Sequence, residues 1–184
     1  MTLMYQGNLV STADPKTVEL GNGWLVSVFR EDNPHRFLGY VSEDGGDNWN
    51  LLFEEPTSIT TLSAINLAAY NNNIYISLGD SGDIYYFDVT NFPRGESLTN
   101  EANVYQFTFS SSYEDIYGDI KLSVEDDNLH VLYGTLWDSS VVTRYEMYYK
   151  RGDLSGGGID WEHEEQIWES QSDYLYFRMT FFTL

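Results

Sequence analysis

The sequence predicts an all-β fold built from about three repeated units of four strands each. Aromatic residues make up 16% of the 184 residues, and flat side chains pack well on pleated strands. No window combines an apolar period of 3.6 residues with helix caps. In addition, one layout of strands and tight turns recurs along the chain, which is typical of repeat architectures.

The recurring layout is a strand, a tight turn, a second strand and a third strand. The turns lie at Gly21–Gly23, Asn71–Asn73 and Glu125–Asn128. Gly adopts positive φ freely, and Asn and Asp tolerate it, so these segments suit hairpin turns. The β-branched and aromatic runs that follow predict the third strands at Arg36–Ser42, Asp83–Val89 and Arg144–Arg151.

The spacing of the units predicts propeller-like blades. Trp49, Tyr105 and Trp161 fall 56 residues apart, each in the expected last strand of its unit. We expect a single all-β repeat domain over residues 1–184. Its units lie roughly at 11–58, 59–112 and 113–170, with terminal strands at 4–10 and 174–184. Closed propellers need about four to eight blades. The sequence therefore predicts a partial propeller, or a ring completed as a homo-oligomer or larger protein assembly.

Composition excludes several kinds of partner. The formal net charge is −20, from 29 acidic and 9 basic residues, so the surface repels phosphate backbones and anionic lipids. We expect no nucleic-acid binding and no membrane insertion, since no apolar run approaches the roughly 20 residues that span a bilayer. The absence of cysteine excludes disulfides and thiolate metal sites. No basic segment followed by an apolar stretch opens the chain, so we expect no signal peptide.

The segment Ser42–Trp49 resembles the Asp-box, the Ser-x-Asp-x-Gly-x-Thr-Trp hairpin of sialidases and related β-propellers. Ser42, Asp44, Gly46 and Trp49 match the motif, and Asn48 stands where the motif has Thr. The resemblance implies a sialidase-like propeller. In that family the box is a folding element remote from the catalytic centre, so these residues are expected to be structural.

A degenerate copy of the box lies in the third unit, at 153–161. Gly158 and Trp161 keep the register, while the Ser and Asp positions are lost. The middle unit has no recognisable copy. The degenerate copy extends the resemblance to the third unit in its arrangement of strands and turns.

The catalytic groups of sialidases, an arginine triad and a Tyr–Glu pair with an acidic proton donor, find little support. Arg30 resembles the first arginine motif but lacks the Ile-Pro that follows it. Tyr145 and Glu146 are adjacent, which places them on opposite faces of a strand. Three further arginines have no motif context: Arg94, Arg144 and Arg178. The three histidines lack metal-ligand spacing: His35, His130 and His163. We therefore expect no catalytic residues.

Two groups of residues are candidates for binding. Sugars stack their C–H faces on aromatic rings, which makes tryptophans candidate ligand-stacking residues, although core packing is the alternative: Trp24, Trp137 and Trp168. Oxygen-rich turns could hold Ca²⁺, although none fits a known calcium loop and solvated turns are the alternative: Asp80, Asp83, Asp126 and Asp127. We expect no cofactor.

These observations favour a non-catalytic structural or receptor-binding module, such as a tail or adhesion protein of a virus or phage particle. A glycan would be its ligand, and it would meet the outside of cells without a signal peptide. Two alternatives stay open. One is a reduced glycoside hydrolase of sialidase type that oligomerisation completes, and the other is a cytoplasmic scaffold that binds proteins.

Overall fold

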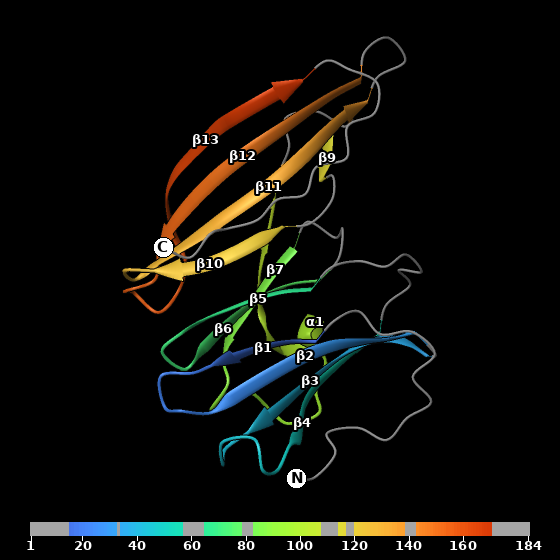
Figure 1. Ribbon diagram of the computed structural model, residues 1–184, viewed down its shortest axis with the longest axis vertical. Helices are drawn as coiled ribbons and strands as arrows, with labels where there is room; N and C mark the ends of the chain where they lie inside the picture. The colour runs from blue at the N-terminus through green and yellow to red at the C-terminus, as the bar shows by residue number, and fades with distance from the viewer. Residues whose placement is uncertain are drawn as a thin grey trace.

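The computed structural model describes residues 15–32, 34–56, 65–78, 83–107, 114–116, 120–138 and 143–170. These residues form three antiparallel sheets that follow one another along the chain, which confirms the all-β, partial-propeller fold (Figure 1). The expected terminal strands at 4–10 and 174–184 lie outside the described residues.

Each sheet pairs four strands in sequence order. The first sheet contains β1 (Lys16–Glu19), β2 (Leu25–Asp32), β3 (His35–Ser42) and β4 (Asn50–Pro56). The second contains β5 (Ile65–Tyr70), β6 (Asn73–Leu78), β7 (Asp83–Asp88) and β8 (Asn103–Gln106). The third contains β10 (Lys121–Glu125), β11 (Asn128–Asp138), β12 (Thr143–Asp153) and β13 (Asp160–Ser170), and β9 (Glu114–Ile116) also pairs with β11. A short helix, α1 (Leu98–Glu101), precedes β8.

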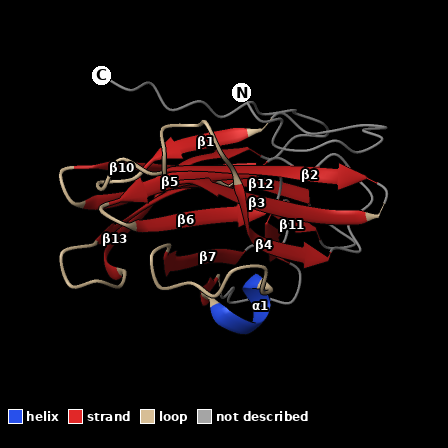
Figure 2. Cartoon of the chain, turned by 90° about the horizontal axis from the view of Figure 1, so that it is seen from below, coloured by secondary structure: helices blue, strands red, loops and turns tan. Residues whose placement is uncertain are grey.

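The first strands of the three sheets lie together at the inner side of the molecule. β5 contacts both β1 and β10, and Figure 2 shows α1 on the opposite side. Residues of these inner strands line a shallow groove of about 290 Å³: Val18, Glu19, Leu67, Ala68, Ala69, Leu122, Ser123 and Val124. The sheets are therefore arranged like blades around a common axis.

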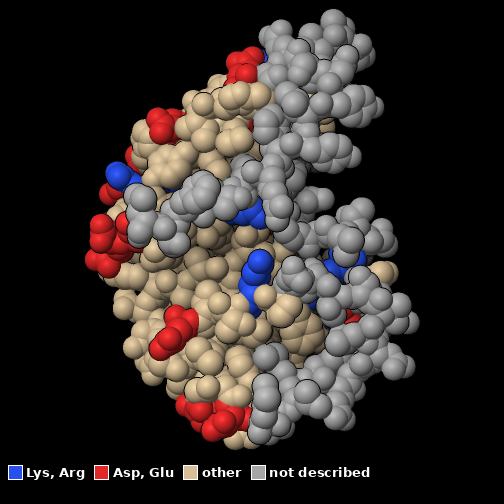
Figure 3. Space-filling model, viewed as in Figure 1, with Lys and Arg blue, Asp and Glu red and all other residues tan. Residues whose placement is uncertain are grey.

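This arrangement gives the molecule two different ends. At one end, which we name the crossover end, the chain leaves β4 at Pro56 and enters β5 at Ile65, and it leaves β8 at Gln106 before it enters the third sheet. At the opposite end, the turn end, short turns join β1 to β2, β5 to β6 and β10 to β11. The acidic side chains in view gather mainly along the turn end (Figure 3).

The turns of the turn end have the backbone conformations that the sequence predicts. φ is positive at Gly23 (81°), Asn71 (54°), Asp126 (46°) and Asp127 (63°). The first two sheets meet here, because the Gly21 N–H donates to the Asn71 carbonyl at 2.6 Å. A Cβ at Gly21 would lie 3.1 Å from the Asn71 Cα, so this close approach favours glycine, and a side chain would push the Asn71 backbone outward by a few tenths of an ångström.

Two apolar clusters hold the sheets together. The first lies between the first and second sheets and includes Val28, Phe53 and Ile76, while the second lies between the second and third sheets and includes Tyr75 and Val131. The Phe53 ring lies over Gly39, where a Cβ would approach a ring atom to 2.2 Å. Full burial of a phenylalanine contributes about 1.5–3 kcal/mol, so the absence of a side chain at this position matters to the core.

The segment 94–99 of the second sheet lies along the outer edge of β4, and we name it the clasp. The Gly95 N–H donates to the Leu52 carbonyl at 2.9 Å, and the Glu54 N–H donates to the Glu96 carbonyl at 3.2 Å. An uncovered sheet edge invites pairing with other chains, and the clasp satisfies part of this edge. The segment between β7 and β8 therefore carries a defined contact with the first sheet and a short helix.

Glu55 of β4 fixes the clasp. Its carboxylate accepts hydrogen bonds from the Ser97 hydroxyl at 2.6 Å, the Thr99 hydroxyl at 2.6 Å and the Thr99 N–H at 3.1 Å. Ser97 is the N-cap of α1 and its own side chain makes no capping bond. A carboxylate from the neighbouring sheet thus caps the helix.

Replacing Glu55 should release the clasp. We expect Glu55→Ala to lower the free energy of unfolding by about 1–2 kcal/mol, because a cap and charge-assisted hydrogen bonds are lost. Urea denaturation measures the change. Glu101→Ala removes an exposed carboxylate from the same helix and serves as the control. Equal losses in the two variants would contradict the capping role.

The turn between β3 and β4 contains the Asp-box-like segment and is held by side-chain hydrogen bonds. Asp44 Oδ1 accepts from the Asn48 N–H and from the Ser42 hydroxyl, both at 2.8 Å, and the Gly46 N–H donates to Ser42 Oγ at 2.8 Å. The Trp49 indole N–H donates to the Gly46 carbonyl at 3.0 Å. φ at Gly46 is 100°, which glycine adopts without strain. The local geometry agrees with a folding role for Ser42, Asp44, Gly46 and Trp49.

The hydrogen bonds of this turn predict an acid-dependent stability. Donation from the Asn48 N–H, then from the Asn48 amide and the Ser42 hydroxyl, lowers the pKa of Asp44 to about 2. The ordinary value is about 3.9, so the ionised form stabilises the folded state above that pH, and the gain disappears as the pH falls through about 2. We expect wild type to be more stable than Asp44→Asn at pH 6, with the difference shrinking between pH 4 and pH 2.

Urea titrations of both proteins from pH 2 to pH 6 check this, since the comparison cancels the other carboxylates. A stability difference that does not change with pH would show that the charge of Asp44 contributes nothing.

Candidate functional site

Buried polar side chains concentrate at the crossover end. Arg30 and Glu31 lie near the end of β2, Ser77 lies near the end of β6, Thr135 lies toward the end of β11, and Glu146 lies near the start of β12. Each is at most 5% exposed. Burying a charge or an unpaired polar group destabilises the folded state. The concentration of buried polar side chains at one end of a propeller-like fold therefore marks a candidate functional site.

Among these buried side chains, Glu146 has the best-defined polar partners. Its carboxylate is 5% exposed, Tyr148 Oη donates to Oε2 at 2.6 Å, and Arg144 Nε lies 2.8 Å from Oε1. The three side chains alternate along β12 and therefore share one face of the strand. Arg144 Nη1 also lies 3.9 Å from Glu169 of β13. A buried carboxylate held by a phenol and a guanidinium is a preorganised nucleophile or base.

This group of side chains was not predicted from the sequence. Tyr145 was the tyrosine considered as a partner of Glu146, and adjacency on a strand excludes it. The partner is Tyr148, two residues further on. The signal was available, because residues i and i+2 of an expected strand at 144–151 lie on the same face.

The first and second sheets also carry carboxylates at the crossover end. Arg36 forms ion pairs with Glu31 and, at 2.7 Å, with Glu54. The hydrogen bond from Arg36 to Glu54 raises the pKa of its guanidinium far above the working range. Asp83 begins β7, and burial raises the pKa of its carboxyl while a hydrogen bond with Gln106 opposes the shift. Each sheet therefore presents an acidic group at this end.

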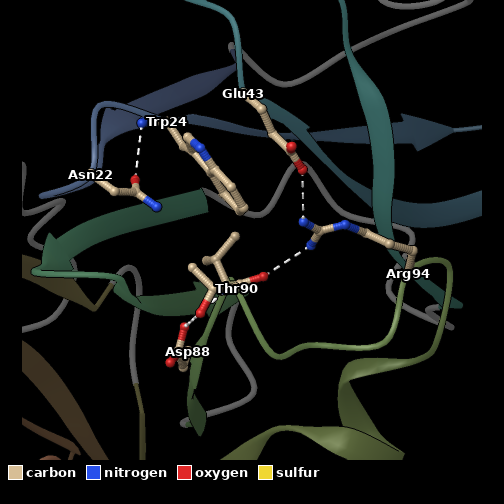
Figure 4. Close-up of polar contacts among 7 residues, drawn as sticks. Asn22, Trp24, Glu43, Asp88, Thr90 and Arg94 are labelled. Atoms are coloured by element: carbon tan, nitrogen blue, oxygen red, sulfur yellow. Dashed lines mark hydrogen bonds and ion pairs between the residues drawn. The ribbon is translucent and has the colours of Figure 1, made fainter.

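Trp24, one of the candidate stacking residues, lies at the turn end (Figure 4). Its indole packs against the first apolar cluster, and the Arg94 guanidinium carbon lies 5.8 Å from the ring centroid. Arg94 in turn donates to the Val89 carbonyl at 2.9 Å and to Glu43 at 3.3 Å. One side of this ring is thus covered by the protein itself.

The structure does not bring the three candidate tryptophans together. Trp137 and Trp168 belong to β11 and β13 near the crossover end, far along the strands from the turn that holds Trp24. Trp168 pairs with Met147 and is half-buried, and the side chain of Trp137 lies outside the description. No shared aromatic platform forms from the described tryptophans.

Trp161 of the degenerate box packs between the third and second sheets. The Trp161 ring centroid lies 4.6 Å from that of Tyr105, and the Lys150 ammonium lies 5.1 Å from the Trp161 ring. The glycine with positive φ is Gly157, at 81°, one residue before Gly158. Trp161 therefore joins the third sheet to the second.

The candidate calcium ligands are scattered. Asp83 lies at the crossover end, Asp126 and Asp127 form the β10–β11 turn at the turn end, and Asp80 lies outside the described residues. Within the described ranges, no group of three or more His, Asp or Glu side chains could hold a metal ion. Nor does this part of the chain contain a helix long and apolar enough to cross a membrane.

Comparison with known proteins shows the fold. No protein-family model matches the chain, and no curated protein matches it in sequence. Among solved structures, it is similar to the α-L-arabinofuranosidase Arb93A of Fusarium graminearum in complex with an iminosugar inhibitor, with 11% identity and a TM-score of 0.51. The same enzyme, described as a GH93 α-L-arabinofuranosidase, with arabinobiose gives the same values. The α-L-arabinanase of Penicillium chrysogenum with arabinobiose matches at 12% identity and a TM-score of 0.51.

In all three matches the alignment covers 83% of this chain and 49% of the solved chain. The chain thus spans about half the length of these proteins. At such low identity the likeness establishes the fold alone.

The matches nevertheless correct two expectations. A non-catalytic structural module of a virus or phage particle was expected, and with it a protein that is not an enzyme. Both expectations are wrong, because the solved proteins that share the fold are glycoside hydrolases. The finding favours the alternative of a reduced glycoside hydrolase. The family relationship implied by the Asp-box-like segment stays a prediction.

Proposed function

We propose that this chain is the catalytic part of a glycoside hydrolase and that Glu146 is its catalytic carboxylate. The observation that carries the proposal is the burial of Glu146 between the Tyr148 hydroxyl and the Arg144 guanidinium, at the end of the fold where buried polar groups gather. The fold that the chain shares with arabinofuran-cleaving enzymes supports the same reaction class.

Hydrolysis of a glycosidic bond uses two carboxyl groups, one as nucleophile or base and one as acid. Glu146 suits the first role, because the Tyr148 hydroxyl donates to its Oε2 and the Arg144 guanidinium forms an ion pair with its Oε1. As a nucleophile it would attack the anomeric carbon, and as a base it would take the proton of the attacking water. The phenol and the guanidinium stabilise its negative charge until the bond breaks.

Asp83 is the candidate acid. Its position at the first residue of β7 places it at the crossover end, and burial raises the pKa of its carboxyl. A raised pKa keeps the proton available for the leaving oxygen at a higher pH. Asp83 shares a face of β7 with Tyr85, which packs against the first apolar cluster, so its carboxyl would have to reach the bond around the crossover-end edge of the second sheet.

The three described sheets leave two outer blade faces to be covered, and the aligned region makes up only 49% of the structurally similar chain. We propose that further blades, such as those of a second copy of the chain, complete the propeller around the site. L-Arabinofuranosyl linkages are the first substrate class to test, since arabinobiose occupies two of the structurally similar proteins.

The decisive variant is Glu146→Gln, which keeps the shape of the side chain and removes its charge. We expect it to lower the rate of arabinose release from arabinobiose by about 100- to 10,000-fold, because the nucleophile or base is lost. The control is Glu165→Gln on β13, which changes an exposed carboxylate by the same atoms. Light scattering records the assembly state of each protein in the assay buffer.

Unchanged turnover in Glu146→Gln would refute the assignment of the catalytic residue. Absence of hydrolysis of arabinobiose and of aryl α-L-arabinofuranosides by every assembly of the wild-type chain would refute the proposed function.

A further inference from the structure

Two uncharged polar side chains among the described residues of the crossover end have buried atoms that bond to no protein group. They are the Thr135 hydroxyl oxygen and the Asn66 amide nitrogen. Thr135 is 1% exposed as a residue. A buried donor or acceptor without a partner destabilises the folded state, so such groups persist where they meet a ligand or water.

Both atoms lie at the seam between the second and third sheets. Asn66 pairs with Ser77 in the register of β5 and β6, and the Ser77 hydroxyl donates to the Ile120 carbonyl at 3.0 Å. Thr135 shares a face of β11 with Tyr133, which belongs to the apolar cluster between these sheets. Asn66 and Thr135 therefore face the same seam from its two sides.

Thr135 also adjoins the candidate catalytic carboxylate. In the register of β11 and β12 it lies directly opposite Glu146, so the two side chains emerge on the same face of the third sheet. A group bound by Thr135 would lie beside Glu146. The uncommitted hydroxyl is thus in position to orient a substrate and not only to fill the core.

Two arginines at this end are already paired with carboxylates, which bears on the kind of substrate. Arg144 lies between Glu146 and Glu169, and Arg36 lies between Glu31 and Glu54. Recognition of a sugar carboxylate requires a cation that its own neighbours have not already neutralised. A chain with a net charge of −20 also repels anionic saccharides as they approach.

We propose that the seam between the second and third sheets binds an uncharged sugar, with the Thr135 hydroxyl and the Asn66 amide bonded to its hydroxyl groups. This inference rests on the proposed function and names its substrate class. It disfavours sialic acid and uronic acid residues as substrates. Sugar hydroxyls both donate and accept, which matches a hydroxyl and an amide N–H on the two walls of the seam.

The test measures affinity and stability in the same variants. Calorimetric titration of the full chain in the Glu146→Gln background, which prevents turnover, compares arabinobiose with digalacturonate. We expect arabinobiose to bind at least 10-fold more tightly. Adding Thr135→Val should weaken arabinobiose binding at least 10-fold, and Asn66→Leu should weaken it as well. The control Thr17→Val removes a hydroxyl of the first sheet that bonds to Ser27, and affinity should not change.

Thermal unfolding separates binding from structure. Thr135→Val is isosteric and removes a hydroxyl that has no protein partner, so its melting temperature should equal or exceed that of the parent. A lower melting temperature with unchanged affinity would make the hydroxyl structural and overturn the inference. So would equal or tighter binding of digalacturonate, or a failure of arabinobiose to bind.

The two proposals can fail separately. If wild type hydrolyses arabinobiose and Thr135→Val keeps the same KM, the seam inference fails and the proposed function stands. If arabinobiose binds with the expected dependence on Thr135 but is not cleaved, the proposed function fails and the seam remains a neutral-sugar site.

Discussion

The burial of both faces of the second sheet is the constraint on which the rest of the structure depends. Along β6, Ile74 and Ile76 pack into the cluster shared with the first sheet, whereas Tyr75 between them packs into the cluster shared with the third. All three are at most 1% exposed. A strand that is apolar on both faces cannot lie at a surface, so the second sheet folds only between two others.

The position of the second sheet between the other two, together with the contacts of β5 to both β1 and β10, makes the two ends of the molecule different. All three first strands run in the same direction, so every tight turn that follows a first strand lies at the turn end. There, the backbone is satisfied locally, as at the Asp44 turn and the Gly21–Asn71 contact. The crossover end instead carries the buried polar groups, and the candidate chemistry is found where local hydrogen bonding is least complete.

Much of the fold could be predicted because its signals are local. The residue types of a turn such as Asn71–Asn73 are enough to predict its backbone conformation. Likewise, the hydrogen bonds of the Asp44 turn join residues within one segment of eight. The candidate site could not be predicted in this way. The environment of Glu146 depends on the register that places Thr135 opposite it and on the burial that the second sheet imposes. Alternation along the strand places Arg144, Glu146 and Tyr148 on one face, but in a sequence with 29 acidic residues this pattern does not show which carboxylate is buried.

The clasp has a consequence for how the protein is made. Glu96 pairs with the edge of β4, and it lies 41 residues after Glu55 in the sequence. At about 5–20 residues per second, synthesis of that stretch takes roughly 2–8 seconds. The first sheet therefore leaves the ribosome with an open edge at β4, and the edge stays open until the clasp has been synthesised. During that interval the edge of β4 is open to pairing with other chains, so the order of emergence, and not only composition, sets how long the nascent chain is exposed.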